Sequence, residues 1–470
     1  MGIISMIRGL YNMIFNGKVK EDFQIESIIS AQMDSVLREC EKIYNGNPNW
    51  IDDDEEIKTI NFAKSICSET ARLATLAIGV RIEGSPRAEW LQEIIDRYYY
   101  DIRKWVEYAC AYGTIILKPS LEGIDLYTTD KVVVTEQKDG NITGIVFITQ
   151  QETNEGKKKY YTRLEYHRYI DDVYVITNKC YVGESENDMK TVVSIDNTPW
   201  KGLKEEVGIE KLKKPLFAVL KTPSANNIDI NSPYSLPVFA EAIEELKDLD
   251  IAYSRNAKEI WDSTRTVLLD SDRMLQTGRK VEENVKAFNN VRKQMRLPNI
   301  VKNVWGDGVQ TFYQEINPSL NTDTRLTGIN ALLSQIGYKC GFSNGYFVFN
   351  ESSGIQTATG VEAEQQRTIQ FIKDVRDKLE VFLTDLIDAI SALADLYNLS
   401  PFGLYEIVFD FGDITYNREE DRARWYGYAN SGKIPFWYYL VKFEGMTEEE
   451  AKALEKEAQP KEPTLFGQEE

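Results

Sequence analysis

The feature that most limits the fold of this chain is the segment 361–400, which contains neither glycine nor proline. Apolar side chains recur along it at every third or fourth position, at Ile369, Ile372, Val375, Leu379, Phe382, Leu386, Ile390, Leu393 and Tyr397. This spacing predicts one amphipathic helix. A helix of about 38 residues would be ~57 Å long, roughly three times the average in globular proteins. A helix of that length crosses a whole domain or lines a large assembly.

The segment before this helix, "SSGIQTATG" at 352–360, is rich in serine, threonine and glycine. Thr359 and Glu362 have the spacing of a capping box, which predicts that the helix begins there. Glycines flank the segment as they do in a phosphate-binding loop, but Val361 and Glu362 stand where a lysine and a hydroxyl residue are needed. A carboxylate at that position would also repel phosphate. We therefore do not expect nucleotide binding.

The spacing of apolar residues changes once in the first half of the chain. Residues 21–110 are predicted to be mostly helical, because segments such as "ETARLATLAIGVRI" place apolar residues three and four apart. Between 113 and 182, β-rich runs surround Asp139-Gly140, a strong hairpin signal, and "YYTRLEYHRYIDDVYVITNKCYVG" indicates a second hairpin. These patterns predict a small antiparallel sheet inserted in a helical framework. The predicted fold class is therefore α+β, mainly helical.

A further helix is predicted from "SLPVFAEAIEELKDLDIAYSRNAKEIWDS", with Ser235 as N-cap and Pro237 in the first turn. Its apolar stripe consists of Phe239, Ile243, Leu246, Leu249, Tyr253, Ala257 and Ile260. Residues 265–303 follow with nine Lys or Arg and four acids, a balance of +5 in a chain whose net charge is -19. The segment "DTRLTGINALLSQIGYKC" then predicts a second helix. The tail predicts two or three shorter helices and a flexible end from "QPKEPTLFGQEE" onward.

The amino-acid composition limits the classes of protein to which this chain could belong. A chain that is 42% hydrophobic is globular, and a net charge of -19 gives an acidic surface that repels nucleic acid and anionic membranes. The five cysteines are scattered and form no CxxC pair, so we expect buried thiols in a reducing cytoplasm. "MGIISMIRGLYNMIF" is interrupted by Arg8 and Asn12, which favours a docking or surface helix over a signal peptide. No apolar stretch is long enough to span a bilayer, so no membrane is expected.

No group of residues demands catalysis. His167 is the only histidine and lies in a strand pattern, so a packed or exposed strand residue is expected rather than a catalytic base. "DDDEE" at 52–56 is expected to be a solvated helix start rather than a metal site. A pair of carboxylates is weak evidence for a glycosidase site in a chain with 74 acidic residues. We predict no catalytic residue, no metal and no cofactor, and therefore no enzyme.

The order of these elements resembles the portal proteins of tailed bacteriophages, especially those of long-tailed phages. The most specific match is "GFSNGYFVFNESSGIQTATGVEAEQQRTI", which resembles a Gly-aromatic segment, a loop and a TATEV-like helix start, with Gly360 in place of the expected Glu. "SPYSLPVFAEAIEELKDLDIAYSRNAKEI" resembles the helix that leads to the clip of that family. "SGKIPFWYYLVKFEGMTEEEAKAL" resembles its C-terminal region. The likeness in element order covers nearly the whole chain.

The resemblance implies a portal-like fold of wing, stem, clip and crown, assembled as a dodecameric ring at one capsid vertex of the virion, after assembly in the host cytoplasm. Such a ring passes double-stranded DNA without sequence preference during packaging and ejection. Its other partners are the terminase large subunit, the major capsid and scaffold proteins, and a head-tail connector or adaptor protein. The expected parts are a wing at 1–235, stem helices at 236–262 and 319–342, a clip at 263–318, a tunnel loop at 343–360, a long tunnel or wing helix at 361–400 and a crown at 401–470.

The resemblance also assigns site residues. The DNA-facing residues of the tunnel loop are Asn350, Ser352, Ser353, Gln356 and Thr357, and the basic clip residues for partner or subunit contact are Arg279, Lys280, Arg292, Lys293 and Arg296. The stem interface residues are Tyr253, Ala257 and Ile260. Because Lys and Arg contacts dominate affinity for DNA, an acidic channel with small neutral loops lets a duplex slide. Its glycines, Gly345, Gly354 and Gly360, predict that this loop is the least ordered inner segment.

Two other classes stay open at this point. One is an enzyme, an acid-pair polysaccharide hydrolase, and the other is a monomeric scaffold or interaction protein. A native mass measurement separates them, because a large closed ring favours the portal and a monomer favours the alternatives.

Overall fold

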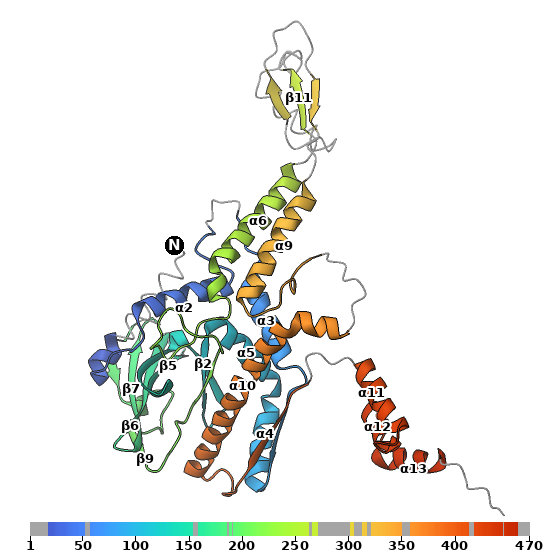
Figure 1. The fold of residues 1–470 in the computed structure, drawn as a ribbon. Coiled ribbons are helices and arrows are strands. Elements are labelled where there is room, and N and C mark those ends of the chain that lie inside the picture. The colour runs from blue at the N-terminus through green and yellow to red at the C-terminus, as the bar shows by residue number, and fades with distance from the viewer. Residues whose placement is uncertain are drawn as a thin grey trace, which may run out of the picture.

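The computed structural model describes residues 17–51, 57–153, 158–185, 188–189, 191–262, 266–270, 301–304, 313–316, 321–349, 358–412, 418–444 and 446–458. A body of helices and sheets carries a projecting pair of helices, with a small sheet beyond the far end of that pair (Figure 1). Three short C-terminal helices lie to one side of the body. The fold contains both helices and strands, with more helix than strand, which confirms the predicted α+β class.

The helical part of the body is largely as predicted. Its helices are α2 (Ala31–Tyr44), α3 (Phe62–Ala74), α4 (Pro86–Arg97) and α5 (Tyr99–Tyr112). The reading of "ETARLATLAIGVRI" as a continuous helix is wrong, because α3 ends at Ala74 and β1 (Gly79–Glu83) follows. Ala77 has a φ of 48°, which cannot continue a right-handed helix. β1 pairs antiparallel with β14 (Glu406–Asp410), a strand far along the chain that no local pattern reveals.

Both predicted hairpins are confirmed, and the sheet that they form is larger than expected. Its strands are β4 (Val132–Lys138), β5 (Asn141–Thr153), β6 (Lys159–Ile170), β7 (Val173–Gly183) and β8 (Thr191–Val193), in that order, with β9 (Glu206–Ile209) also on β7. Every pairing is antiparallel. Asp139 and Gly140 have φ values of 51° and 76° and join β4 to β5, as a tight two-residue hairpin turn requires.

A second sheet lies at the centre of the body. β2 (Thr114–Pro119) runs between β10 (Ala218–Lys221) and β3 (Ile124–Thr128), and every residue of β2 is buried. The 3-10 turn Thr129–Lys131 joins β3 to β4 of the larger sheet, and a second 3-10 turn, Ile195–Asn197, lies between β8 and β9. The main hydrophobic core gathers α3, α4, α5, β2 and the long helix.

The long helix predicted from the sequence is α10, which spans the 40 residues Ala358–Tyr397. Most of its predicted apolar stripe is buried, with Ile372, Leu379, Phe382 and Leu386 at 0% exposure. The predicted start is wrong, because the helix begins before Val361 and Thr359 lies inside its first turn rather than at the N-cap. Gly360 is likewise helical and does not precede the helix.

The projecting pair consists of α6 (Ile243–Asp262) and α9 (Thr322–Lys339). Ser235 and Pro237 do not begin α6, which corrects the predicted start of the first stem helix at 236. The 3-10 turn Ala240–Ala242 comes first, and residues 235–238 pack against the end of α5 instead, where Val238 N donates to Cys110 O at 3.0 Å. This tertiary contact overrides the local capping signal.

Beyond the pair, β11 (Thr266–Asp270) lies between β12 (Val301–Val304) and β13 (Tyr313–Ile316). At the C-terminus, α11 (Arg418–Asn430), α12 (Phe436–Glu444) and α13 (Glu448–Ala458) confirm the predicted short helices. They share a small core of their own that includes Tyr439 and Phe443. Residues 401–470 are nevertheless not one unit, because β14 belongs to the body.

Gly113 provides a test of this packing. It ends α5 with a φ of +73°, and a Cβ there would lie 2.0 Å from the carbonyl oxygen of Ser235. We expect Gly113→Ala to lower the free energy of unfolding by roughly 2–4 kcal/mol through strain and overpacking. Chemical denaturation measures the change.

Gly328→Ala is the matched control, because Gly328 lies in α9 and a methyl group added there would meet nothing within 4 Å. That variant should be neutral or more stable by about 0.5–1 kcal/mol. Equal stability of Gly113→Ala and the native chain would contradict the packing of residues 235–238 on α5.

Candidate functional site

The projecting helices are tied to each other at both ends. Lys339 Nζ lies 2.6 Å from Glu245 Oε1 near the body, and Arg325 pairs with Glu259 towards the far end. Lys339 also donates to the carbonyl oxygen of Glu241 at 2.9 Å. Each partly exposed pair stabilises the protein by at most about 1 kcal/mol, so the pairs fix the register of the two helices more than their stability.

A buried carboxylate attaches α6 to the body. Asp250 Oδ2 accepts from Trp50 Nε1 at 3.0 Å, and its Oδ1 accepts from the backbone N–H of Ile60 at 3.0 Å. One turn further, the Ser254 hydroxyl accepts from Lys58 N at 2.8 Å. Burial raises the pKa of the Asp250 carboxyl, while these donors oppose that rise. The base of the projecting pair is therefore held by specific polar contacts as well as by apolar packing.

The predicted stem interface residues lie on the outer half of α6. The apolar stripe divides there, because Leu246 and Leu249 are buried whereas Tyr253 is 43% and Ile260 is 51% exposed. Ala257 is exposed as well. The single chain thus leaves the outer part of the stripe uncovered, and whether another chain covers it stays a prediction.

The segment after α9 is anchored rather than free. Ser343 N donates to Thr368 Oγ1 at 2.8 Å, and Thr368 N donates to Ser343 Oγ at 3.2 Å. Both residues are buried. Gly341 has a φ of +90° beneath the ring of Phe371, where a Cβ would lie 2.7 Å from Phe371 Cγ. This reciprocal pair and the close approach hold the segment against α10.

Two further contacts hold the next residues. Asn330 Nδ2 donates to Phe349 O at 2.9 Å, and Phe349 N donates to Asn330 Oδ1 at 3.2 Å. The Tyr346 hydroxyl bonds to Glu69 of α3. Of the predicted tunnel loop at 343–360, residues 343–349 therefore pack on the body and residues 358–360 belong to α10.

A groove of about 660 Å³ lies beside this anchored segment. At the edge of the groove, Arg367 Cζ lies 3.9 Å from the centre of the Tyr338 ring, and the guanidinium donates to the Tyr338 carbonyl oxygen at 2.9 Å. The other residues that line the groove are Gly341, Ser343, Asn344, Gln366, Gln370, Phe371 and Asp374. One cation and one carboxylate line the groove, and the rest is neutral, so its lining holds little net charge.

Many of the predicted site residues lie outside the described residues. These are the DNA-facing residues Asn350, Ser352, Ser353, Gln356 and Thr357 and the basic residues Arg279, Lys280, Arg292, Lys293 and Arg296. The predicted N-terminal helix and the acidic run at 52–56 lie outside them too. The structure describes the chain on either side of residues 350–357, up to Phe349 and from Ala358 onward.

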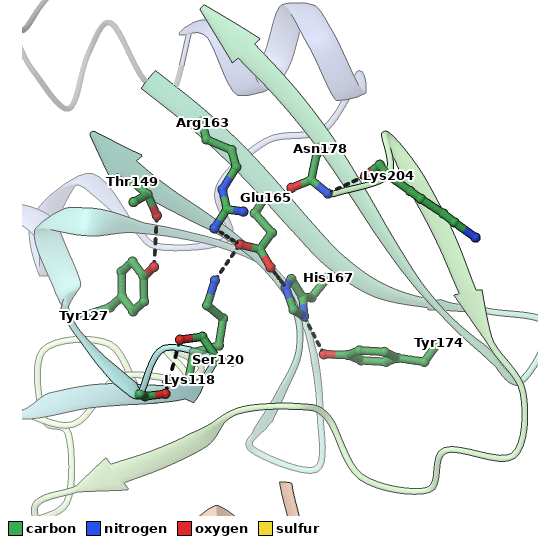
Figure 2. A network of polar contacts seen from close by, with 11 residues as sticks. Lys118, Ser120, Tyr127, Thr149, Arg163, Glu165, His167, Tyr174, Asn178 and Lys204 are labelled. Atoms are coloured by element: carbon green, nitrogen blue, oxygen red, sulfur yellow. Dashed lines mark hydrogen bonds and ion pairs between the residues drawn. The ribbon is translucent and has the colours of Figure 1, made fainter. Parts of the chain in front are cut away.

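A buried network of charges in the sheet is the one arrangement among the described residues that could suggest catalysis (Figure 2). Glu165 accepts from Lys118, from Arg163 Nη2 at 2.7 Å and from His167 Nε2 at 2.9 Å. His167 Nδ1 lies 2.7 Å from the Tyr174 hydroxyl, which in turn accepts from the backbone N–H of Leu216 at 3.1 Å. With the proton on Nε2, every polar atom of the imidazole has a partner.

The network is sealed and unsuited to proton transfer. Burial alone would raise the pKa of Glu165, but Lys118, His167 and Arg163 together hold it well below its ordinary value. Burial lowers the pKa of His167 despite the neighbouring carboxylate. Glu165 therefore stays ionised and His167, at 1% exposure, stays neutral at pH 7. His167 is a strand residue as predicted, and of the two predicted alternatives, packed or exposed, it is the packed one. We interpret the network as structural.

The sequence analysis did not predict this network, although three of its residues lie close together in the sequence. Arg163, Glu165 and His167 occupy alternate positions of β6, so they lie on one face of the strand. Three polar residues on a face that is otherwise buried indicate mutual pairing. Lys118, however, comes from β2 in the other sheet, and no local pattern could identify it.

Two other features are absent from the part of the chain that the structure describes. Among these residues there is no group of His, Cys, Asp or Glu that could hold a metal ion, and none of the described helices is long and apolar enough to cross a membrane. Cys40, Cys67, Cys110, Cys180 and Cys340 are all buried and unbridged, which confirms the predicted buried thiols.

Neither a scan against models of protein families nor a search of curated protein sequences finds a match for this chain. A functional assignment therefore depends on the sequence and the geometry alone.

The titration of His167 gives a testable pH dependence. Its pKa is about 6.5 in an unfolded chain and is lowered in the folded one. The stability that depends on the neutral imidazole is therefore present above about pH 6.5 and is lost as the pH falls below it. Thermal unfolding between pH 8 and pH 5 should show a steeper loss for the native chain than for His167→Gln.

Because the chain has a single histidine, the difference between the two profiles isolates this one group. Parallel profiles for the native chain and His167→Gln would show that the imidazole is not held neutral by burial.

Proposed function

We propose that this chain is the subunit of a portal ring of a tailed bacteriophage, a conduit for genome packaging and ejection at one capsid vertex. The observation that carries the proposal is the order of parts along one axis. A body bears the antiparallel helices α6 and α9, a small sheet lies beyond them, and the chain after α9 continues into the 40-residue helix α10 (Figure 1). This order resembles the stem, clip and tunnel elements of portal proteins.

We assign the proposed parts of the ring to the elements of the chain. The stem consists of α6 and α9, the clip of residues 263–318, the tunnel or wing helix of α10, and the crown of the helices from α11 onward. We propose a dodecamer closed by head-to-tail contacts, because one repeated heterologous contact generates a ring. The uncovered outer stripe of α6, with Tyr253, Ala257 and Ile260, supplies one side of that contact.

The proposed conduit role depends on residues 350–357, which follow an anchored segment and precede α10 in the sequence. The Ser343–Thr368 pair and the Asn330–Phe349 pair fix the chain just before residue 350, and α10 begins at Ala358. The intervening segment has one charge, Glu351, and small polar side chains. Such side chains make weak, sequence-independent contacts with phosphates, so the duplex slides through the acidic channel and is not held.

The proposed partners divide between the two ends of the subunit. We assign the excess of Lys and Arg within 265–303 to the clip, where the terminase large subunit and later the adaptor protein would dock. The body would meet the major capsid and scaffold proteins. No catalytic residue is needed, because a conduit does not carry out the chemistry of packaging.

The ring contact is tested by Ile260→Asp. A carboxylate in an apolar interface is costly to bury, so the variant should give monomers or open oligomers where the native chain gives closed rings. Native mass spectrometry with a sizing column measures this. Ile230→Asp is the control, because Ile230 is 85% exposed and is not part of α6.

If Ile260→Asp still gave closed rings, α6 would not take part in the subunit contact. A native chain that is purely monomeric would argue against the portal and in favour of a scaffold protein or an acid-pair hydrolase.

The contact with DNA is tested by Gln356→Glu. Adding one negative charge per subunit at the proposed DNA surface should repel phosphate and alter packaging or retention of the genome with little effect on the fold. Gln151→Glu is the control, because Gln151 is an exposed residue of β5. Particles of both variants are compared for DNA content, and normal packaging and retention with Gln356→Glu would exclude residue 356 from the channel surface.

A further inference from the structure

A cavity of about 260 Å³ lies where α2 packs on the large sheet (Figure 1). The packing brings Met33 and Leu37 of α2 into a core that contains Val132 and Val134 of β4. Beside this core, the cavity is lined by residues of α2, of β4 and β5, and of the 3-10 turn Thr129–Lys131. Its lining belongs neither to the buried charge network of β6 nor to the outer part of α6, and the proposed ring contact does not use it.

Tyr234 lines the cavity and carries a hydroxyl group that the described chain leaves unsatisfied. The residue is 4% exposed. Its backbone is held on both sides, because Tyr234 N donates to Ser232 Oγ at 3.2 Å and Asn226 Nδ2 donates to Tyr234 O at 3.0 Å. The hydroxyl, in contrast, makes no hydrogen bond with any residue in the described part of the chain. A buried hydroxyl group usually has a partner, so we expect its partner to come from outside these residues.

The hydroxyl group of Tyr234 lies near two carboxylates. Burial raises the pKa of Tyr234, and the charges of Asp130 and Asp34 add to the rise. Because both of these residues line the cavity, their effect places the phenol oxygen on the cavity side of the ring. The phenol is therefore protonated at neutral pH, and it offers the cavity one donor together with its lone pairs.

Each of the two carboxylates has one oxygen that is bound by the chain and one that has no partner among the described residues. Asp34 Oδ2 accepts from Arg38 Nη2 at 2.6 Å, one turn away on α2. Asp130 Oδ1 accepts from the Thr128 hydroxyl. These bonds orient the two side chains from separate elements, α2 and the turn after β3. The second oxygen of each carboxylate remains available to a ligand.

The charges around the cavity favour a cation. Three carboxylates line it, those of Asp34, Glu41 and Asp130, against the single guanidinium of Arg38. Asp34 already pairs with that guanidinium, although Arg38 Nε is buried and has no partner among the described residues. An anion at Arg38 is therefore the competing occupant, and the excess of carboxylates disfavours it.

The rest of the wall is apolar and narrows the class of cation. Its residues are Ile29, Leu37, Val132 and Ile148. A metal ion is a poor match, because no group of His, Cys, Asp or Glu among the described residues could hold one. A quaternary ammonium has no N–H and would leave the three oxygens without donors. A primary ammonium has three donors, one for each oxygen, and its methylene chain would displace water from the apolar wall.

We propose that this cavity binds a primary alkylammonium group, which donates to Tyr234, Asp34 and Asp130 while its methylene chain lies against the apolar wall. The group can belong to a free aliphatic amine or to a lysine side chain of a partner protein, since both present the same chemistry. The proposal is independent of the proposed portal function, because the cavity lies within one chain and its use requires no assembly.

Isothermal titration calorimetry of the full-length chain with pentylamine at neutral pH tests the proposal. We expect saturable binding with a Kd on the order of 1 mM or tighter, which a ligand of this size permits. Pentanol, which lacks the charge, and pentyltrimethylammonium, which lacks N–H donors, should each bind about tenfold more weakly or worse. Pentanoate tests the competing anion. Equal binding of pentanol or of pentyltrimethylammonium, tighter binding of pentanoate, or no saturation by pentylamine at about ten times the expected Kd overturns the proposal.

Tyr234→Phe separates binding from structure. Because the hydroxyl has no partner in the described chain, its removal should weaken pentylamine binding severalfold but leave the unfolding temperature of the free protein unchanged or higher. Tyr127→Phe is the matched control, because Tyr127 has the same 4% exposure and its hydroxyl bonds to Thr149 Oγ1 at 2.9 Å. That variant should unfold at a lower temperature and bind pentylamine normally. If Tyr234→Phe instead unfolds earlier and binds normally, the hydroxyl is a structural group and the proposal fails.

The carboxylates are tested in the same assay. Asp34→Asn and Asp130→Asn should each weaken pentylamine binding severalfold, because each removes a charged acceptor. Asp130→Asn is the sharper of the two, since Asp34→Asn also breaks the pair with Arg38. Asp196→Asn is the control and should bind normally, because Asp196 is exposed and does not line the cavity. Equal affinity of Asp130→Asn and Asp196→Asn overturns the proposal.

A blocked lysine, Nα-acetyl-lysine methylamide, distinguishes the two sources of the ammonium group. Its side chain carries the same ammonium and methylene chain as a lysine within a protein. Binding as tight as that of pentylamine supports a lysine side chain of a partner. Binding about tenfold weaker or worse, with pentylamine still bound, supports a free aliphatic amine.

Discussion

Burial of one face of α10 is the constraint on which the rest of the body depends. Ile372, Leu379, Phe382 and Leu386 are fully buried along this helix, and they contact a core that also includes α3, α4, α5 and the central sheet. Two buried arginines complete the arrangement by donating to carbonyl groups where the chain leaves a helix. Arg376 of α10 donates to Leu73 O and Ala74 O at the end of α3, each at 3.0 Å. Arg87 of α4 does the same for the chain after α10, where it donates to Ser400 O at 2.8 Å and to Pro401 O at 3.0 Å.

These arginines show how a long helix with a wide apolar face can hold elements from distant parts of the sequence. The last carbonyl groups of a helix have no partner within it, so burying such an end without donors would be costly. A guanidinium offers five donors in a fixed plane and can satisfy several carbonyls at once. Neither contact is visible in the sequence, since Arg87 and Arg376 each read as one charged residue among many.

The sequence predicted those elements whose cause is local. The lack of glycine and proline in 361–400 and its three-four spacing were enough for α10, and Asp139-Gly140 was enough for the first hairpin. The secondary-structure predictions were wrong where contacts between distant segments determine the local structure. Ser235 and Pro237 looked like a helix start but pack against α5, and "GVRIE" forms a strand only because β14 lies beside it. Of the candidate site, the stem residues were predicted as part of an apolar stripe, whereas the Ser343–Thr368 anchor and the Lys118 partner of Glu165 depend on contacts between distant segments.

The continuity of α10 has a structural consequence. Its first turn follows the segment that contains residues 350–357, and its last turn leads into the loop held by Arg87, which precedes the exposed side chains of Phe402 and Leu404. At 1.5 Å per residue the 40 residues of α10 measure about 60 Å along the path of the helix, with no proline among them. The segment at the N-terminal end of α10 and the surface at its C-terminal end are therefore joined through one unbroken ladder of backbone hydrogen bonds.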